Sequence, residues 1–158
     1  MVKIMLILGK GGHTSQILQL MKKLPKKYEY CFLVCYEDPI SGMKVKGAEI
    51  YKASMPSVEG EPLFMAFFRS IKTFFQAINI LIKSKVDVII TAGPGLGAVF
   101  SYAAKLLNKK IIFLETWSRV YSKSKAGRLS YPIADLFFVQ WKQMKKIYPK
   151  AIYAGRLG

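Results

Sequence analysis

The sequence has few of the side chains that bind metal ions. It holds one histidine and two cysteines among 158 residues. Cys31 and Cys35 lie in an apolar run that predicts a strand, where four steps separate residues by about 13 Å. A disulfide needs Cα atoms within about 7 Å, so we expect two buried, reduced thiols. Since no other cysteine or histidine can complete a metal site and no carboxylate cluster is present, the sequence predicts no metal.

Acidic residues are also scarce. Nine Asp and Glu stand against 25 Lys and Arg, so the formal net charge is +16. This charge favours polyanionic partners, namely nucleic acid, anionic lipid or a phosphorylated substrate. Only the charge supports nucleic acid, because the sequence shows neither an aromatic and basic RNA-binding motif nor a helix-turn-helix signature. We therefore expect no nucleic-acid partner.

A long hydrophobic run is missing as well. The most apolar region, residues 63–82, contains Arg69 and Lys72. It falls short of the roughly 20 apolar residues that a transmembrane helix needs. The sequence therefore predicts no transmembrane segment, and any membrane contact is expected to be peripheral or through a partner.

The sequence does contain a regular alternation of short apolar runs and helical patterns. Near-continuous apolar runs are typical of a parallel sheet covered on both faces. We predict one α/β domain over residues 1–158, with a doubly wound, Rossmann-like parallel sheet. Strands are expected at residues 2–8, 28–36, 48–53, 86–92, 109–115, 136–140 and 151–155, and the main helices at 13–24, 63–83, 96–107 and 142–148. Ligands of such sheets bind at the carboxyl ends of the strands.

The first apolar run ends in a glycine turn that contains the only histidine, "GKGGHTS" at residues 9–15. Gly11 and Gly12 allow close backbone approach, and the N-terminus of the following helix offers free N–H groups to an anion. Thr14 is expected to cap the helix and to donate a hydrogen bond. We predict that His13 contacts substrate or acts in catalysis. The alternative is a helix residue without chemical function.

This turn fits neither common nucleotide-binding pattern. A Walker A loop would need GK[ST], which does not follow, and in G-x-G-x-x-G the third glycine would stand where Thr14 or Ser15 stands. Glu37 and Asp38 nevertheless lie near the end of the second predicted strand, where an NAD-binding acid belongs. A stand-alone nucleotide- or NAD-binding Rossmann enzyme is therefore the alternative function.

Two further segments fall on the same predicted edge of the sheet. Gly93, Pro94 and Gly95 form a turn into a helix and predict a second anion-binding N-terminus, with plain turn chemistry as the alternative. Glu115 ends an apolar strand, and Arg119 follows within one loop. A carboxylate there can accept a proton from a substrate hydroxyl, and the arginine can bind phosphate. The alternative is a local ion pair between the two.

The predicted helix at residues 63–83 has a wide apolar arc. Most of this arc is expected to face the core. The aromatic residues at its N-terminal end exceed what one sheet face needs, and lysines lie nearby. Phe64, Phe67 and Phe68 are therefore predicted to rest on anionic lipid, with an ordinary core helix as the alternative.

Five segments together resemble a known family. They are "GKGGHTSQIL" at 9–18, "GPG" at 93–95, "ETWSRV" at 115–120, "GRLSYPIADLFFVQW" at 127–141 and "YPKAIYAGRL" at 148–157. In this order they resemble the acceptor-side, membrane-recruiting subunit of the two-part UDP-N-acetylglucosamine transferase of N-glycosylation, the fourteenth asparagine-linked-glycosylation protein. Bacterial polysaccharide enzymes use a similar split pair.

The resemblance implies the fold of the N-terminal half of a GT-B glycosyltransferase, like the lipid II-forming transferase of peptidoglycan synthesis. It implies that the chain binds a polyprenyl- or dolichyl-pyrophosphate-linked sugar at the cytoplasmic face of a membrane. A separate subunit would hold the UDP-sugar across a shared cleft, and the C-terminal tail would help to hold that subunit. The implied reaction is inverting transfer of N-acetylglucosamine or a related sugar, without metal or cofactor, and the chain alone would be inactive.

The resemblance also implies a set of site residues. Either His13 or Glu115 would be the general base for the acceptor hydroxyl. The carried-over motif residues are Gly9, Gly11, Gly12 and His13 of the first turn, Gly93, Pro94 and Gly95 of the second, and Glu115 with Arg119. Among them Gly11, Gly12, Gly93, Pro94, Gly95 and Arg119 are expected to bind substrate, and Thr14 is added to them as the hydrogen-bond donor predicted above.

Overall fold

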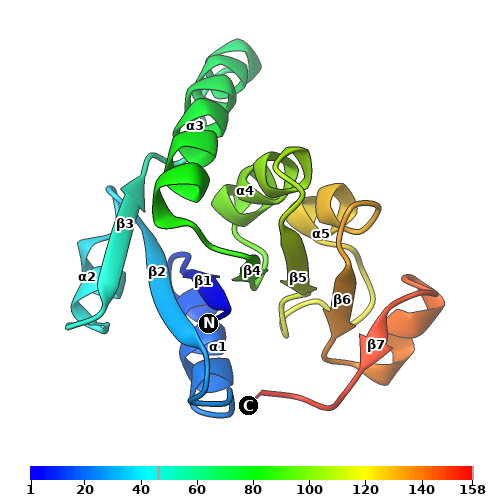
Figure 1. Ribbon diagram of the computed structural model, residues 1–158. Coiled ribbons are helices and arrows are strands. Elements are labelled where there is room, and N and C mark those ends of the chain that lie inside the picture. The colour runs from blue at the N-terminus through cyan, green and yellow to red at the C-terminus, as the bar shows by residue number, and fades with distance from the viewer. Residues whose placement is uncertain (46, 158) are drawn as a thin grey trace.

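The computed structural model describes residues 1–45 and 47–157 and shows one sheet of seven strands (Figure 1). The strands are β1 (Lys3–Ile7), β2 (Glu29–Cys35), β3 (Glu49–Ala53), β4 (Val88–Thr91), β5 (Lys110–Leu114), β6 (Leu136–Val139) and β7 (Ile152–Tyr153). Their order is β3-β2-β1-β4-β5-β6-β7, and each neighbouring pair is parallel. The predicted Rossmann-like sheet is confirmed. The predicted domain, residues 1–158, includes Lys46 and Gly158, which lie outside the described residues.

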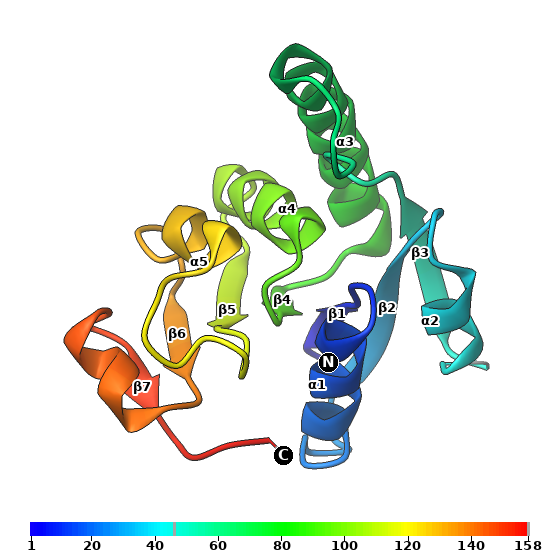
Figure 2. The same ribbon diagram turned by 180° about the vertical axis from the view of Figure 1, so that it is seen from behind.

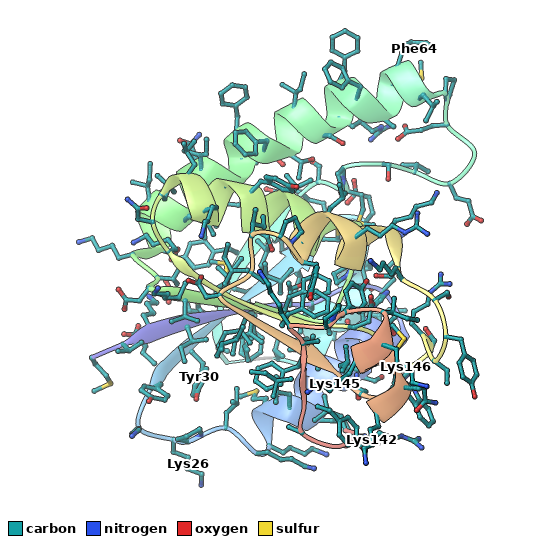
Figure 3. The ribbon with its side chains drawn as sticks, turned by 90° about the vertical axis from the view of Figure 1, so that its right-hand side faces the viewer. Lys26, Tyr30, Phe64, Lys142, Lys145 and Lys146 are labelled. Atoms are coloured by element: carbon teal, nitrogen blue, oxygen red, sulfur yellow. The ribbon has the colours of Figure 1, made fainter. Side chains whose placement is uncertain are left out.

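Helices cover both faces of the sheet. They are α1 (Gly12–Met21), α2 (Pro39–Met43), α3 (Leu63–Ser84), α4 (Gly95–Leu106), α5 (Lys125–Ser130) and the 3-10 helix η1 (Lys142–Lys146). Figure 3 views the layers from the side, with α3, α4 and α5 on one face and α1 and η1 on the other. From β7 the C-terminal tail runs back toward α1 (Figure 1, Figure 2).

Two short elements differ from the expectation. The helix predicted at residues 142–148 is the five-residue 3-10 helix η1, and residues 39–43, which show no helical periodicity, form α2. α2 begins because the carboxylate of Asp38 accepts a hydrogen bond from the Ser41 N–H, while Pro39 occupies the first turn. Elements this short depend on individual capping contacts rather than on hydrophobic periodicity.

Each face of the sheet has its own apolar core, because successive strand residues point to opposite sides. The core toward α3 and α4 includes Met5, Ile7, Leu33, Ile89 and Phe100, and the core toward α1 includes Leu6, Leu8, Ile17, Phe32 and Ile90. Both cysteines lie in the first core as free thiols. Both are buried, as predicted, and burial raises the pKa of Cys31 and of Cys35 to about 12, so both thiols stay protonated at neutral pH.

The strand order places a crevice between β1 and β4. The chain leaves β1 toward β2 on one side, while β4 extends the sheet on the other, so their carboxyl ends flank the switch point where Rossmann-like sheets bind ligands. Ile7 of β1 pairs with Thr91 of β4, so the two glycine turns start side by side. α4 approaches β4 closely because Gly97 has no side chain, and a Cβ there would collide with Thr91.

Candidate functional site

A cavity of about 570 Å³ opens at this carboxyl edge. Its wall comes from the start of α1, the turn before α4, the loop after β5, the N-terminus of α5 and the segment before α3. The structure thereby brings together His13, Gly93, Gly95 and Arg119, which come from three separate motifs.

His13 stands in the first turn of α1 and is held in one orientation. Its Nδ1 lies 2.6 Å from the carbonyl oxygen of Ala92. Because a carbonyl only accepts, Nδ1 carries the proton, and in the neutral ring Nε2 bears the free lone pair. The ring packs on Gly93, where φ is +89° and a Cβ would lie 3.6 Å from Cε1 of His13. A histidine fixed in this tautomer can take a proton from a hydroxyl group at Nε2.

The two glycine turns touch each other. A Cβ on Gly9 would lie only 2.7 Å from the Cβ of Pro94, so the first turn fits only without a side chain there. Gly95 begins α4 and lines the cavity, which therefore borders a helix N-terminus whose first N–H groups lack partners within the helix. Pro94 is buried beneath the turn, and Gly11 and Gly12 are exposed beside the cavity rather than in its wall.

Thr14 serves the first turn rather than the cavity. Its side chain is fully buried, its hydroxyl donates to the carbonyl oxygen of Gly9, and it lies 2.7 Å from Oγ of Ser41. The N-cap of α1 is Gly11, without a side-chain cap bond. The prediction that Thr14 caps the helix is wrong, and Thr14 does not line the cavity, because its contacts join the turn to α2.

Glu115 lies behind the cavity. The residue is only 1% exposed. Its carboxylate accepts hydrogen bonds from the N–H groups of Thr116 (3.0 Å) and Ser124 (3.3 Å) and from the hydroxyl of Tyr148 (2.7 Å). Burial and the neighbouring carboxylate raise the pKa of Tyr148, which keeps its hydroxyl a donor. A Cβ on Gly127 would collide with the carboxylate, so α5 covers it. The structure does not place Glu115 where a general base must stand.

The loop that Glu115 holds supplies positive charge to the cavity. Arg119 is exposed, lines the cavity and donates to Oγ of Ser122 at 3.3 Å, so the alternative of an ion pair with Glu115 is wrong. Lys125, at the first turn of α5, also lines the cavity. The sequence interpretation missed Lys125, although Ser124 is an N-cap residue and its Oγ accepts from the N–H of Gly127 at 2.8 Å.

Two buried glutamines, also missed, connect this loop to distant elements. Oε1 of Gln16 on α1 accepts from the N–H of Trp117 at 3.1 Å and from Nε2 of Gln140 at 2.5 Å. Oε1 of Gln140 accepts from the N–H of Leu157 in the tail at 3.2 Å. The cavity wall, β6 and the C-terminal tail are therefore linked. In the sequence, the one sign of this link was Gln16, a polar side chain on the apolar face of α1.

The two acidic residues that an NAD-binding enzyme would use are engaged elsewhere. Asp38 accepts from the hydroxyl of Ser41 at 2.5 Å, and Glu37 accepts from the N–H of Met55 at 3.3 Å. Neither lines the cavity. Their loop contacts do not favour binding of a ribose.

α3 presents its aromatic end to solvent. Phe64, Phe67 and Phe68 are 62%, 62% and 67% exposed. By length and composition α3 could cross a membrane, which the prediction of no transmembrane segment did not anticipate, although the core helix of a soluble protein meets the same test. Ala77 and Leu81 in its C-terminal half are fully buried in the core of the sheet.

Comparisons with known proteins agree with this architecture. Residues 4–157 match the family described as "Oligosaccharide biosynthesis protein Alg14 like". The human protein named UDP-N-acetylglucosamine transferase subunit ALG14 is 26% identical over 99% of this chain and 83% of its own length. The Schizosaccharomyces pombe protein of the same name is 32% identical over 96% of this chain and 81% of its own.

Two solved structures show the same fold. MurG of Acinetobacter baumannii has a TM-score of 0.73 at 20% identity, and the match covers 99% of this chain and 44% of MurG. The UDP-N-acetylglucosamine 2-epimerase of Rickettsia bellii has a TM-score of 0.76 at 12% identity, with 99% and 45% covered. This chain therefore spans less than half of either structure and matches the predicted half of a GT-B fold. By its match from residue 4 to residue 157, the chain belongs to the Alg14 family.

Proposed function

We propose that this chain is the acceptor-binding subunit of a two-part transferase that moves N-acetylglucosamine, or a related sugar, from UDP to a polyprenyl-pyrophosphate-linked sugar. The names of its relatives, which call them UDP-N-acetylglucosamine transferase subunits, support this activity. The observation that carries the proposal is His13, which lines a cavity bordered by a helix N-terminus and two cations and whose Nε2 has no hydrogen-bond partner in the described part of the chain.

In the proposed reaction, the cavity holds the acceptor and orients its hydroxyl. Arg119, Lys125 and the N-terminus of α4 bind the acceptor pyrophosphate. Nε2 of His13 takes the hydroxyl proton while the hydroxyl oxygen attacks C1 of the donor sugar, opposite to the UDP. The new C1–O bond forms as the bond from C1 to UDP breaks, UDP leaves with the electron pair, and the configuration at C1 inverts. His13 then gives its proton to solvent.

The donor site belongs to a partner in this proposal. Similar solved structures are more than twice as long as this chain, and the relatives are named as subunits, which supports a second component. A groove of about 350 Å³ on the α1 side, lined by Leu20, Ile112, Phe138 and the tail residue Leu157, offers an apolar docking surface. Lys142, Lys145 and Lys146 lie on the same side of the sheet (Figure 3). A partner with an apolar, acidic segment fits this surface.

Co-expression tests the proposal. The chain is co-expressed with the product of the neighbouring reading frame, as a candidate UDP-sugar-binding subunit, and purified. Transfer from UDP-N-acetylglucosamine to a polyprenyl-pyrophosphate-linked sugar is then measured by chromatography of the lipid product. We expect a stable complex and transfer with both chains, and no transfer with either chain alone. Absence of a complex, together with no transfer from any UDP-sugar, would overturn the proposal.

We further propose that α3 enters the cytoplasmic face of a membrane without crossing it. Because the C-terminal half of α3 packs on the sheet through Ala77 and Leu81, residues 63–72 are the part free to enter lipid. Ten helical residues span roughly 15 Å, about half of the ~30 Å hydrocarbon core. The net charge of +16 supports anionic headgroups as the surface.

Vesicle flotation tests this placement. The double variant Phe67→Ser and Phe68→Ser is expected to bind anionic vesicles about tenfold more weakly or worse, because two large apolar side chains no longer enter lipid. Its free energy of unfolding should change by less than about 0.5 kcal/mol, since both side chains are exposed. Ile82→Ser is the matched control, because Ile82 is 58% exposed at the other end of α3. Equal flotation of the double variant and the control would show that α3 is an ordinary core helix.

A further inference from the structure

A second hollow lies between α3 and α4, directly beside the cavity. It has a volume of about 550 Å³ and is walled by Phe67, Ile71, Phe74 and Phe75 of α3, and by α4. Ser70, Val99 and Tyr102 line both hollows, so the cavity and this α3–α4 groove adjoin along these three residues. The cavity is lined by polar residues such as His13 and Arg119, whereas the α3–α4 groove on the other side of the three shared residues is lined mainly by apolar side chains.

Both hydroxyl groups at the junction between the two hollows donate hydrogen bonds within the chain. The hydroxyl of Ser70 donates to the carbonyl oxygen of Pro56 at 3.1 Å. The hydroxyl of Tyr102 donates to the carbonyl oxygen of Leu129 at 3.0 Å. These bonds use both hydroxyl hydrogens, and the remaining residue of the junction, Val99, is apolar. A ligand that spans the junction must therefore change from polar to apolar at this point.

The groove also reaches the aromatic end of α3. Phe67 lines it and is 62% exposed, and Phe64 marks the outer end of the same helix in Figure 3. Ile71 and Phe75 are 39% and 62% exposed along the groove, which is more apolar surface than a solvent-facing helix needs. The groove therefore connects the segment proposed to enter lipid with the cavity proposed to bind pyrophosphate.

We propose that the α3–α4 groove binds the first isoprene units of the acceptor's polyprenyl chain. The inference rests on the proposed function and extends it from the pyrophosphate to the lipid. A polyprenyl chain is the occupant that matches the groove, because it is apolar along its length and is attached to the anion that the cavity is built to hold. With the pyrophosphate beside Arg119, the polyprenyl chain of the acceptor passes Val99 and Tyr102 and extends past Phe67 into the membrane.

Binding of soluble probes to the chain tests this path without a membrane or a partner. Inorganic pyrophosphate and farnesyl diphosphate both present a diphosphate group, and only the second carries isoprene units. We expect farnesyl diphosphate to bind about tenfold more tightly than pyrophosphate by titration calorimetry, because the groove buries several methylene groups. In Ile71→Ser and in Phe75→Ser this advantage should largely disappear, while the affinity for pyrophosphate stays unchanged.

Two controls separate the groove from the rest of the molecule. Ile82→Ser, on α3 outside the groove, should keep the full advantage of farnesyl diphosphate. Phe64→Ser, at the tip of α3, should keep it too while weakening vesicle binding. Equal affinity of the two probes for the wild-type chain, or an advantage that survives both groove variants, would overturn the inference and leave the pyrophosphate site standing. A change of oligomeric state in Ile71→Ser with no change in farnesyl affinity would assign the groove to a second protein chain instead. If neither probe binds, both the inference about the groove and the proposed acceptor site are wrong.

Discussion

A Glu115→Ala variant is expected to lose about 3 kcal/mol of its free energy of unfolding. The substitution leaves the hydroxyl of Tyr148 and the N–H groups of Thr116 and Ser124 without the carboxylate that each of them reaches. Buried donors left without an acceptor cost about 1–3 kcal/mol each before the surroundings relax, and bonds to a charged group cost the most. Urea denaturation followed by circular dichroism measures the loss.

Two further variants show what the carboxylate does. Glu115→Gln keeps one oxygen acceptor and should fall between the wild-type chain and Glu115→Ala. Glu59→Ala removes an exposed carboxylate from the loop before α3 and should change stability by less than about 0.5 kcal/mol. A Glu115→Ala variant that is as stable as wild type, yet inactive in the complex, would contradict the role of Glu115 in holding the loop after β5. It would instead indicate that Glu115 takes part in the reaction.

This expectation depends on contacts that the sequence did not reveal. Strand position alone predicted a carboxylate at the functional edge, and Glu115 does follow directly after the last residue of β5, Leu114. Its burial follows from Tyr148, which lies 33 residues later, and from Gly127, which lets α5 approach. Gln16 and Gln140 meet across 124 residues in the same way. Such side-chain partners are set by tertiary packing and leave little trace in local pattern.

Features that arise from backbone geometry were predictable. Near-continuous apolar strands indicated a parallel sheet, and a parallel sheet places the ends of its strands at one edge. This reasoning brought His13, Gly93 and Arg119 to one site without knowledge of any contact. It could not distinguish the residues in the wall, such as Gly95, from those that support the turn, such as Thr14, because both kinds occur in the same turns.

His13→Ala is expected to reduce sugar transfer by the complex at least about 100-fold. The variant removes the histidine of the cavity wall, whose Nδ1 donates to the carbonyl oxygen of Ala92 and whose Nε2 has no hydrogen-bond partner among the described residues. The free energy of unfolding should change by no more than about 1 kcal/mol, because His13 is only partly buried and loses one net hydrogen bond. Transfer is measured with saturating UDP-sugar and acceptor, so that the loss is read in kcat.

His13→Asn distinguishes two roles of His13, as the general base and as the residue that joins the two turns through its hydrogen bond to Ala92. Asparagine keeps an N–H donor near the position of Nδ1 and so retains a bond to Ala92, but it has no atom in place of the basic Nε2. If His13 is the base, the asparagine variant stays as inactive as alanine while pyrophosphate still binds with wild-type affinity. If His13 only joins α1 to the turn before α4, asparagine restores most of kcat. Recovery of activity in His13→Asn would therefore remove His13 from proton transfer, and the acceptor hydroxyl would need another base, from the partner's side of the cleft.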